Sequence, residues 1–193
     1  MSTSCRFRGL TVVCLSLFSC LLVNATCFAQ GLELFLIGQQ MKGDQTTGLG
    51  QQLDIGEHSA GGFGMGIDMG KFNLNMDLLF GSTNIKVDIT EMDSKLFFFD
   101  ANLDYAFLNR AITPLVTVGI GSVNFSDSFV KIENVNETDF SSNIGVGLRA
   151  AISDRLFFKG LYRTVWTKIK ETDKSIGFSG ISLSLGYRFV FKY

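Results

Sequence analysis

Residues 62–80 read GFGMGIDMGKFNLNMDLLF, and their alternation of apolar and polar side chains decides the fold. Apolar side chains occupy every second position before the Gly70-Lys71 pair, and again every second position after it. A period of two over this length predicts β-strands that are apolar on one face and small or polar on the other. Two such segments separated by two residues, one of them glycine, predict a β-hairpin.

The same alternation recurs along the rest of the chain. It predicts six further strands, near residues 32–41, 97–107, 114–123, 140–151, 156–166 and 178–193. The links between strands alternate between short ones (70–71, 108–113 and 152–155) and long polar ones (42–57, 82–95, 124–139 and 167–177). Outer-membrane barrels have even strand numbers from eight upward, short periplasmic turns and longer outer loops. The chain is therefore predicted to be all-β: an eight-stranded, antiparallel, up-and-down transmembrane β-barrel.

Aromatic residues gather toward both ends of the predicted strands. The periplasmic ends would carry Phe72, Tyr105, Phe107, Phe158, Phe189, Phe191 and Tyr193, and the outer ends Phe80, Phe97, Phe99, Phe125, Phe140, Trp166 and Phe178. Two aromatic belts are typical of a barrel that spans a membrane. A secreted lipocalin-like barrel would instead have an apolar interior and a polar exterior. Here the uninterrupted face is the apolar one, which favours the membrane.

Residues 1–29 predict a cleaved N-terminal signal peptide. Two arginines precede an apolar run of about 16 residues, which is shorter than the ~20 that a membrane-spanning helix needs. Small residues at Cys27 and Ala29 fit the −3 and −1 positions of a signal-peptidase site. We expect cleavage after Ala29, with Ala25 as the alternative, and a barrel domain over residues 30–193.

Charge and cysteine content narrow the class of protein further. The 193-residue chain has 17 basic and 18 acidic residues and a net charge of −1, so no nucleic-acid partner is expected. The mature barrel would contain no disulfide, thiolate metal site or cysteine nucleophile, because every cysteine precedes Ala29. These are Cys5, Cys14, Cys20 and Cys27. A lipoprotein signal at Cys20 is disfavoured by Phe18.

Three segments carry a family resemblance. Residues 140–163, FSSNIGVGLRAAISDRLFFKGLYR, join a Gly-x-Gly strand, a Ser-Asp-Arg-Leu turn and a strand ending in Tyr-Arg. With ITPLVTVGIG (112–121) and the terminal LGYRFVFKY (185–193), they resemble the small eight-stranded outer-membrane barrels of the OmpA/OmpX type, including opacity-like surface proteins. The resemblance implies a closing strand recognised by the barrel-insertion machinery, although Tyr193 replaces the usual Phe and Arg188 stands where a glycine is expected. It implies architecture more than activity.

No catalytic residue, cofactor or metal is expected, and the protein is predicted not to be an enzyme. The only histidine, His58, lies between Glu57 and Ser59, and consecutive residues of an extended segment point apart rather than converge as a catalytic triad. We expect His58 at a solvated loop edge. No helix follows the glycine-rich residues 62–66, as a dinucleotide fingerprint requires. Calcium could bind the acidic residues of one outer loop, but a solvated charge cluster is favoured. Those residues are Asp88, Glu91 and Asp93.

Charged residues are expected inside the barrel on two opposite walls. Early strands supply the acids Glu33, Asp68, Asp77, Asp100 and Asp104, and late strands supply the bases Arg149, Lys159, Arg163, Arg188 and Lys192. An eight-stranded barrel is only wide enough for its own side chains. Counting from the periplasmic ends pairs Asp104 with Lys159, Asp77 with Arg188 and Asp100 with Arg163. We expect these six residues to form an ion-pair network that closes the lumen. The alternative is that several of the charges are hydrated at the rims.

The function expected from these features is that of an integral protein of the cell outer membrane with a side-chain-filled lumen. It would act structurally or through its surface loops, in adhesion, host-factor binding or envelope integrity. The alternatives are a membrane-embedded lipid-modifying enzyme, for which His58 is the only candidate residue, and a narrow, low-conductance pore. Expected partners are outer-membrane lipid, the barrel-insertion machinery, and a host or envelope ligand at the outer loops.

Overall fold

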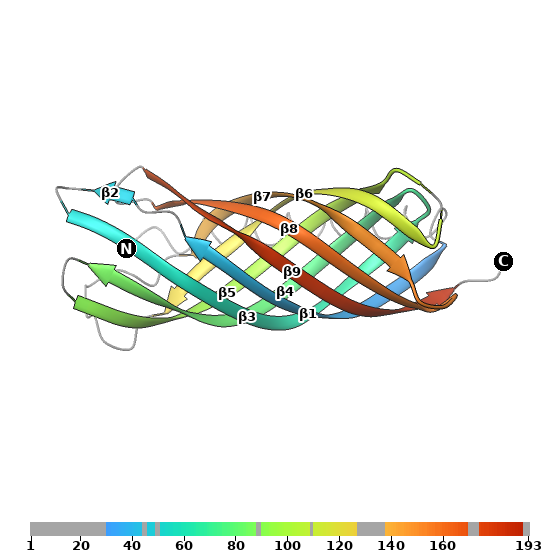
Figure 1. Ribbon diagram of the computed structural model, residues 1–193, viewed down its shortest axis with the longest axis horizontal. Coiled ribbons are helices and arrows are strands. Elements are labelled where there is room, and N and C mark those ends of the chain that lie inside the picture. Colours follow the sequence, from blue (N-terminus) through green and yellow to red (C-terminus); the bar gives the residue numbers. More distant parts are fainter. Residues whose placement is uncertain are drawn as a thin grey trace, which may run out of the picture.

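The computed structural model describes residues 30–43, 46–48, 51–87, 90–108, 110–126, 138–169 and 174–190. The expected signal peptide and residues 191–193 lie outside this part. Antiparallel strands wind around one axis in an elongated barrel (Figure 1). They are β1 (Gly31–Gly43), β2 (Thr46–Gly48), β3 (Gln51–Met69), β4 (Phe72–Val87), β5 (Thr90–Ala106), β6 (Ile112–Ser126), β7 (Thr138–Ala151), β8 (Leu156–Ile169) and β9 (Lys174–Val190).

The strands pair in sequence order, and the two ends of the sheet meet. From β3 to β9 each strand pairs with the next, while β1 pairs with both β3 and β9 and so closes the barrel. Strand β2 pairs with β3 alone, so eight of the nine described strands form the wall. The predicted eight-stranded, antiparallel, up-and-down barrel is therefore confirmed. Among the described residues, no helix is long and apolar enough to cross a membrane.

The predicted hairpin turn lies where the alternation is interrupted. Met69 pairs with Phe72, so Gly70 and Lys71 alone connect β3 to β4. Gly70 has a φ of +83°, a left-handed conformation that favours glycine. Its N–H donates to Asp68 Oδ1 at 2.9 Å, which holds the turn closed.

The alternation of the sequence becomes an alternation between lumen and exterior. Along β1 every second residue is buried and the residues between them are exposed. Large apolar side chains lie exposed on the outer wall, among them Leu36, Phe63, Ile120, Val146 and Leu183. A continuous exposed apolar surface of this kind is unfavourable in water and fits a hydrocarbon surrounding.

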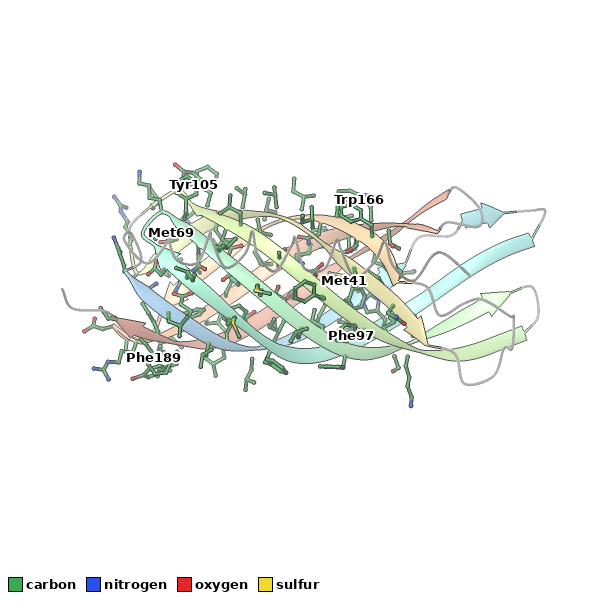
Figure 2. The ribbon with its side chains drawn as sticks, turned by 180° about the vertical axis from the view of Figure 1, so that it is seen from behind. Met41, Met69, Phe97, Tyr105, Trp166 and Phe189 are labelled. Atoms are coloured by element: carbon green, nitrogen blue, oxygen red, sulfur yellow. The ribbon has the colours of Figure 1, made fainter. Side chains whose placement is uncertain are left out.

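Aromatic side chains form belts toward both ends of the exposed apolar band. Tyr105 and Phe189 lie at one end, and Phe97 and Trp166 lie toward the other (Figure 2). Rings from neighbouring strands contact one another in each belt, with centroids 5.1 Å apart both for Phe72 with Tyr105 and for Phe80 with Phe97.

One predicted member of the outer belt lies elsewhere. Phe178 is fully buried inside the barrel. Side chains at every second position of β9 point into the lumen, and Phe178 is on the same face of the strand as the inward-facing Ser182 and Ser184. The side chains of Phe125, Phe191 and Tyr193 lie outside the described residues.

Three of the four long polar links, 42–57, 82–95 and 167–177, are for the most part strand rather than loop, and most of the fourth lies outside the described residues. Strands β4 and β5 remain paired out to Val87 and Thr90, so the expected loop 82–95 is a continued hairpin (Figure 1). The links 42–57 and 167–177 are shortened in the same way by β1, β2, β3, β8 and β9. Apolar alternation marks only the part of a strand that faces lipid, whereas backbone pairing continues wherever it satisfies the N–H and C=O groups. The strands predicted from the sequence are therefore too short, because their polar outer parts were interpreted as loops.

Candidate functional site

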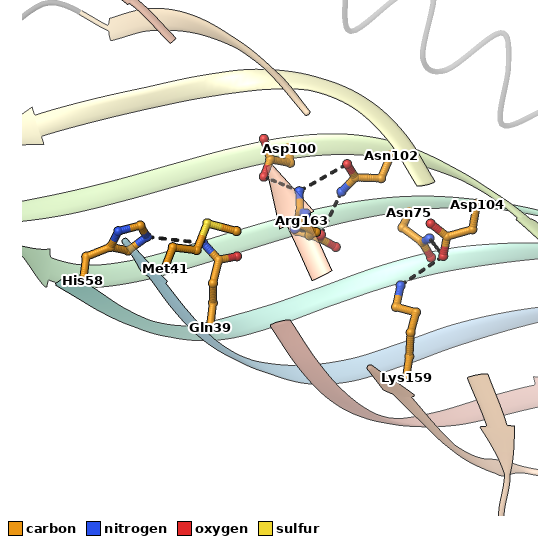
Figure 3. Close-up of polar contacts among 10 residues, drawn as sticks. Gln39, Met41, His58, Asn75, Asp100, Asn102, Asp104, Lys159 and Arg163 are labelled. Atoms are coloured by element: carbon orange, nitrogen blue, oxygen red, sulfur yellow. Dashed lines mark hydrogen bonds and ion pairs between the residues drawn. The ribbon is translucent and has the colours of Figure 1, made fainter. Parts of the chain in front are cut away.

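The centre of the barrel is occupied by one arginine that bridges two carboxylates. Arg163 on β8 places Nη2 2.9 Å from Asp100 Oδ2 and Nη1 3.4 Å from Asp77 Oδ2 (Figure 3). Asn102 completes the group by donating its Nδ2 to the same Asp77 oxygen at 2.8 Å. The two acids lie on β4 and β5 and the cation on β8, so the contacts cross the lumen.

A second cation lies nearer the end of the barrel that carries the short turns, which is the periplasmic end in outer-membrane barrels. Lys159 Nζ is 3.0 Å from Asp104 Oδ2, which also accepts a hydrogen bond from Asn75 Nδ2 at 2.7 Å. The same ammonium lies 4.9 Å from the centre of the Phe35 ring, within the range of a cation–π contact. The carboxylate and the ring both contact the ammonium, so its charge is compensated inside the lumen.

The third charged group lies at the periplasmic mouth. Glu33 accepts from Arg188 Nε at 2.9 Å and from Arg149 Nη2 on one oxygen, and from Asn73 Nδ2 at 2.6 Å on the other. Arg188 Nη1 also lies 3.0 Å from Asp68 Oδ2. Glu33 and Arg188 are direct partners in the pairing of β1 with β9, so this ion pair spans the junction that closes the barrel.

The structure brings together two of the three expected pairs, Asp104 with Lys159 and Asp100 with Arg163. The expected pairing of Asp77 with Arg188 is wrong: Asp77 contacts Arg163, and Arg188 contacts Glu33 and Asp68. Barrel strands tilt and are staggered relative to one another, so equal distance from a strand end does not mean equal height along the barrel axis. Lys192 lies outside the described residues.

The outer half of the lumen contains an aromatic and apolar layer that sequence reasoning missed. His58 is fully buried, with its ring stacked on Phe98 at 5.6 Å and edge-on to Phe178 at 5.3 Å. Gln39 Nε2 lies 3.5 Å from His58 Nε2 and also donates to Met41 Sδ at 3.2 Å (Figure 3).

The expectation of a solvated His58 is therefore wrong. Strand β3 begins at Gln51, and this places His58 in a paired strand on the inward parity of Ala60 and Gly64. The alternation of inward and outward positions could have placed His58 in the lumen, but only if β3 was known to begin well before the apolar stretch that starts at residue 62.

These contacts fill the barrel interior with side chains at successive levels. From the periplasmic mouth outward they are the Glu33 group, the Lys159 group, the Arg163 group and the aromatic layer around His58. Charges within this interior are mostly paired across the lumen.

An outward apolar band, two aromatic belts and a polar, filled interior define an integral β-barrel membrane protein. The profile of the family described as "Outer membrane protein beta-barrel domain" matches residues 15–189, so the chain belongs to this family and lies in the outer membrane. The resemblance to small eight-stranded outer-membrane barrels is thereby confirmed.

Solved structures share the fold at low sequence identity. Neisserial surface protein A is 14% identical with a TM-score of 0.62, over 83% of this chain and 97% of that one. OprG from Pseudomonas aeruginosa is 11% identical with a TM-score of 0.60, over 84% and 98%. The N-terminal β-barrel domain of P. aeruginosa OprF is 16% identical with a TM-score of 0.50, over 83% and 98%. None of the curated proteins compared with the chain matches it.

Proposed function

We propose that this protein is a closed barrel that anchors an outer platform of paired strands, and that it acts at the cell surface or as a structural element of the envelope. The observation that carries the proposal is the filling of the lumen at two levels, by Arg163 with its carboxylates and by the aromatic layer around His58. A barrel whose lumen is closed does not transport molecules through its interior. Its function would then depend on its outer end.

The outer end is suited to contact with other molecules. Strands β3, β4 and β5 continue beyond the belt formed by Phe80 and Phe97, and β4 and β5 pair as far as Val87 and Thr90. Paired strands hold the segments at their tips in a defined place, as binding loops require. Adhesion, host-factor binding and envelope support all use such a surface.

Export and assembly follow from the same proposal. Residues 1–29 would be removed as a signal peptide, and residues 30–193 would be folded into the membrane by the barrel-insertion machinery. Outer-membrane lipid would then contact the exposed apolar band. A mature protein whose N-terminus is Gln30, found by sequencing the protein from outer-membrane fractions, supports the predicted cleavage after Ala29; an N-terminus at Thr26 indicates cleavage after Ala25 instead.

Catalysis on membrane lipid is the weaker alternative. Its only candidate residue, His58, faces the lumen between Phe98 and Phe178 and has no route to the lipid face. An assay of lipid A from cells with the unmodified protein and with His58→Ala separates the two: an unchanged lipid A pattern supports the non-catalytic role. A modification that requires His58 contradicts it.

Planar-bilayer recording tests closure and also the alternative of a narrow pore. We expect the unmodified protein to give no stable conductance. Replacing Phe98 and Phe178 by alanine together should raise the conductance, whereas Phe80→Ala, on the outer wall, is the matched control and should not. A stable, porin-like conductance of the unmodified protein contradicts the proposal.

A further inference from the structure

A pocket of about 410 Å³ opens at the periplasmic end of the barrel, beside the turn between β7 and β8. Its lining includes three arginines, Arg149, Arg155 and Arg188, and one acid, Asp154. Leu156 and Phe157 contribute an apolar wall. The volume is within the range of small-molecule sites and larger than one inorganic ion needs.

Backbone hydrogen bonds hold the walls of this pocket in place. The N–H groups of Ile152 and Ser153 donate to Leu156 O at 2.8 and 3.1 Å, and Ser153 Oγ accepts from Leu156 N at 3.0 Å. The turn is also attached to β9, because Arg188 N donates to Arg155 O at 2.6 Å. The pocket is therefore built on a connected turn whose arginines have defined positions.

Charge is distributed unevenly between the floor of the pocket and its opening. The side chains of Glu33 and Asp68 are 1% and 3% exposed, whereas those of their partners Arg149 and Arg188 are 15% and 30% exposed. The carboxylates lie behind and the guanidiniums in front. An incoming molecule meets positive charge first.

The two inner guanidiniums keep unused donors. Glu33 Oε1 accepts from both Arg149 and Arg188, yet a guanidinium has five N–H groups. Arg149 is further held by stacking on Phe157, 4.1 Å from the ring centre. At the rim, Arg155 also lines the pocket, and its Nη1 donates to Tyr187 Oη at 3.0 Å. Among the described residues, the acid that lines the pocket with them is Asp154.

We propose that this pocket binds a phosphate ester, with the arginines around the phosphate and the apolar wall against the rest of the molecule. Guanidinium groups match the geometry of phosphate oxygens by bidentate hydrogen bonding. Glu33 and Asp68 offset the charges of Arg149 and Arg188 from behind, so it is the unused guanidinium donors at the opening that favour an oxyanion as the occupant.

Two sources of a phosphate ester reach this site, a phospholipid headgroup of the inner leaflet and a soluble phosphate ester of the periplasm. The lipid source is next to the site, because Leu156 and Phe158 are exposed on the outer wall. Tyr187 forms part of the aromatic belt through its contact with Phe189, with ring centroids 4.9 Å apart. Aromatic belts lie at the level of lipid headgroups.

The experiment measures lipid retained by the full-length mature protein in detergent micelles by native mass spectrometry. Phosphatidylglycerol and the matching diacylglycerol, which lacks phosphate, are the probes. We expect one phosphatidylglycerol to be retained and diacylglycerol to be lost. Glycerol 3-phosphate is then added as a competitor: displacement of the lipid assigns the site to soluble phosphate esters, and no displacement assigns it to phospholipid.

Variants separate a built site from general attraction of anions. Arg155→Gln and Arg149→Gln should each lower retention of phosphatidylglycerol about five- to tenfold, the cost of a lost charged hydrogen bond. Tyr187→Phe removes the partner of Arg155 but keeps the cation, and Lys71→Gln removes a cation from another turn at the same end. Both should retain the lipid, and migration of unheated samples on gels verifies that each variant is folded. Equal retention of the two probes, unchanged retention in both arginine variants, or an equal loss with Lys71→Gln overturns the proposal.

Discussion

Replacing Arg163 by leucine tests whether desolvated charges hold the barrel together. Its guanidinium contacts Asp100 at 2.9 Å and Asp77 at 3.4 Å, and the three side chains are between 1% and 6% exposed. Water has little access to the carboxylates that would be left behind. Removing one partner of a buried pair costs about 3–5 kcal/mol, and because two acids lose their partner here we expect about 5 kcal/mol of unfolding free energy to be lost.

Urea titration in lipid vesicles measures this loss, with the fluorescence of Trp166, the only tryptophan, as the signal. Lys71→Leu removes a cation from an exposed turn and is the matched control, with an expected change within about 0.5 kcal/mol. Arg163→Lys keeps the charge without the fork that reaches both acids and should cost about 1–3 kcal/mol. A loss below about 1 kcal/mol for Arg163→Leu would mean that the lumen is hydrated and would refute the reasoning.

Two further predictions concern packing and topology. Gly119→Ala should lower the unfolding midpoint, because a Cβ there would overlap Asn102 Oδ1, whereas Gly38→Ala meets nothing within 4 Å and is its control; equal midpoints in urea would contradict this. Protease added to intact cells should cut within residues 124–139 and spare the Gly70-Lys71 turn, as mapped by mass spectrometry of the fragments. Primary cutting at Gly70-Lys71 would reverse the topology.

The barrel wall could be predicted from the sequence because its surroundings are uniform. Lipid faces every strand from outside, so every strand has to be apolar on one face, and a period of two is visible in the sequence without knowledge of the partner strands. This is why the 62–80 hairpin and the strand that ends the barrel were found from the chain alone. Where lipid ends, near Phe80 and Phe97, the pattern ends too, and the continuing strands were taken for loops.

The contacts inside the barrel could be predicted only in part. The lumen contains both apolar and charged side chains, so the inward positions have no uniform pattern in the sequence. Parity assigned Asp77, Asp100 and Arg163 to the lumen, but the height at which each residue meets the opposite wall depends on strand tilt and stagger. Arg188 was given the wrong partner for this reason. His58 and Phe178 were misplaced because their parity has meaning only once the strand that contains them has been recognised.

The division of the lumen charges into an acidic and a basic wall follows the order of the chain. Glu33, Asp77 and Asp104 come before residue 127, and Lys159, Arg163 and Arg188 come after residue 137. If the chain were divided within residues 127–137, the two fragments would carry opposite lumen charges and would each lack their counter-ions.

Such fragments should recognise one another when they are mixed in lipid, as two halves of one barrel. The pairing of β1 with β9 contains a contact that forms only in the correct register. Glu33 faces Arg188, a residue 155 positions away along the chain. A slip of two residues would keep the outward-facing side chains of both strands on the outside but would place Glu33 opposite Gly186 or Val190. The alternation of apolar and polar residues is equally satisfied in that misaligned register, whereas the ion pair between Glu33 and Arg188 is lost in it.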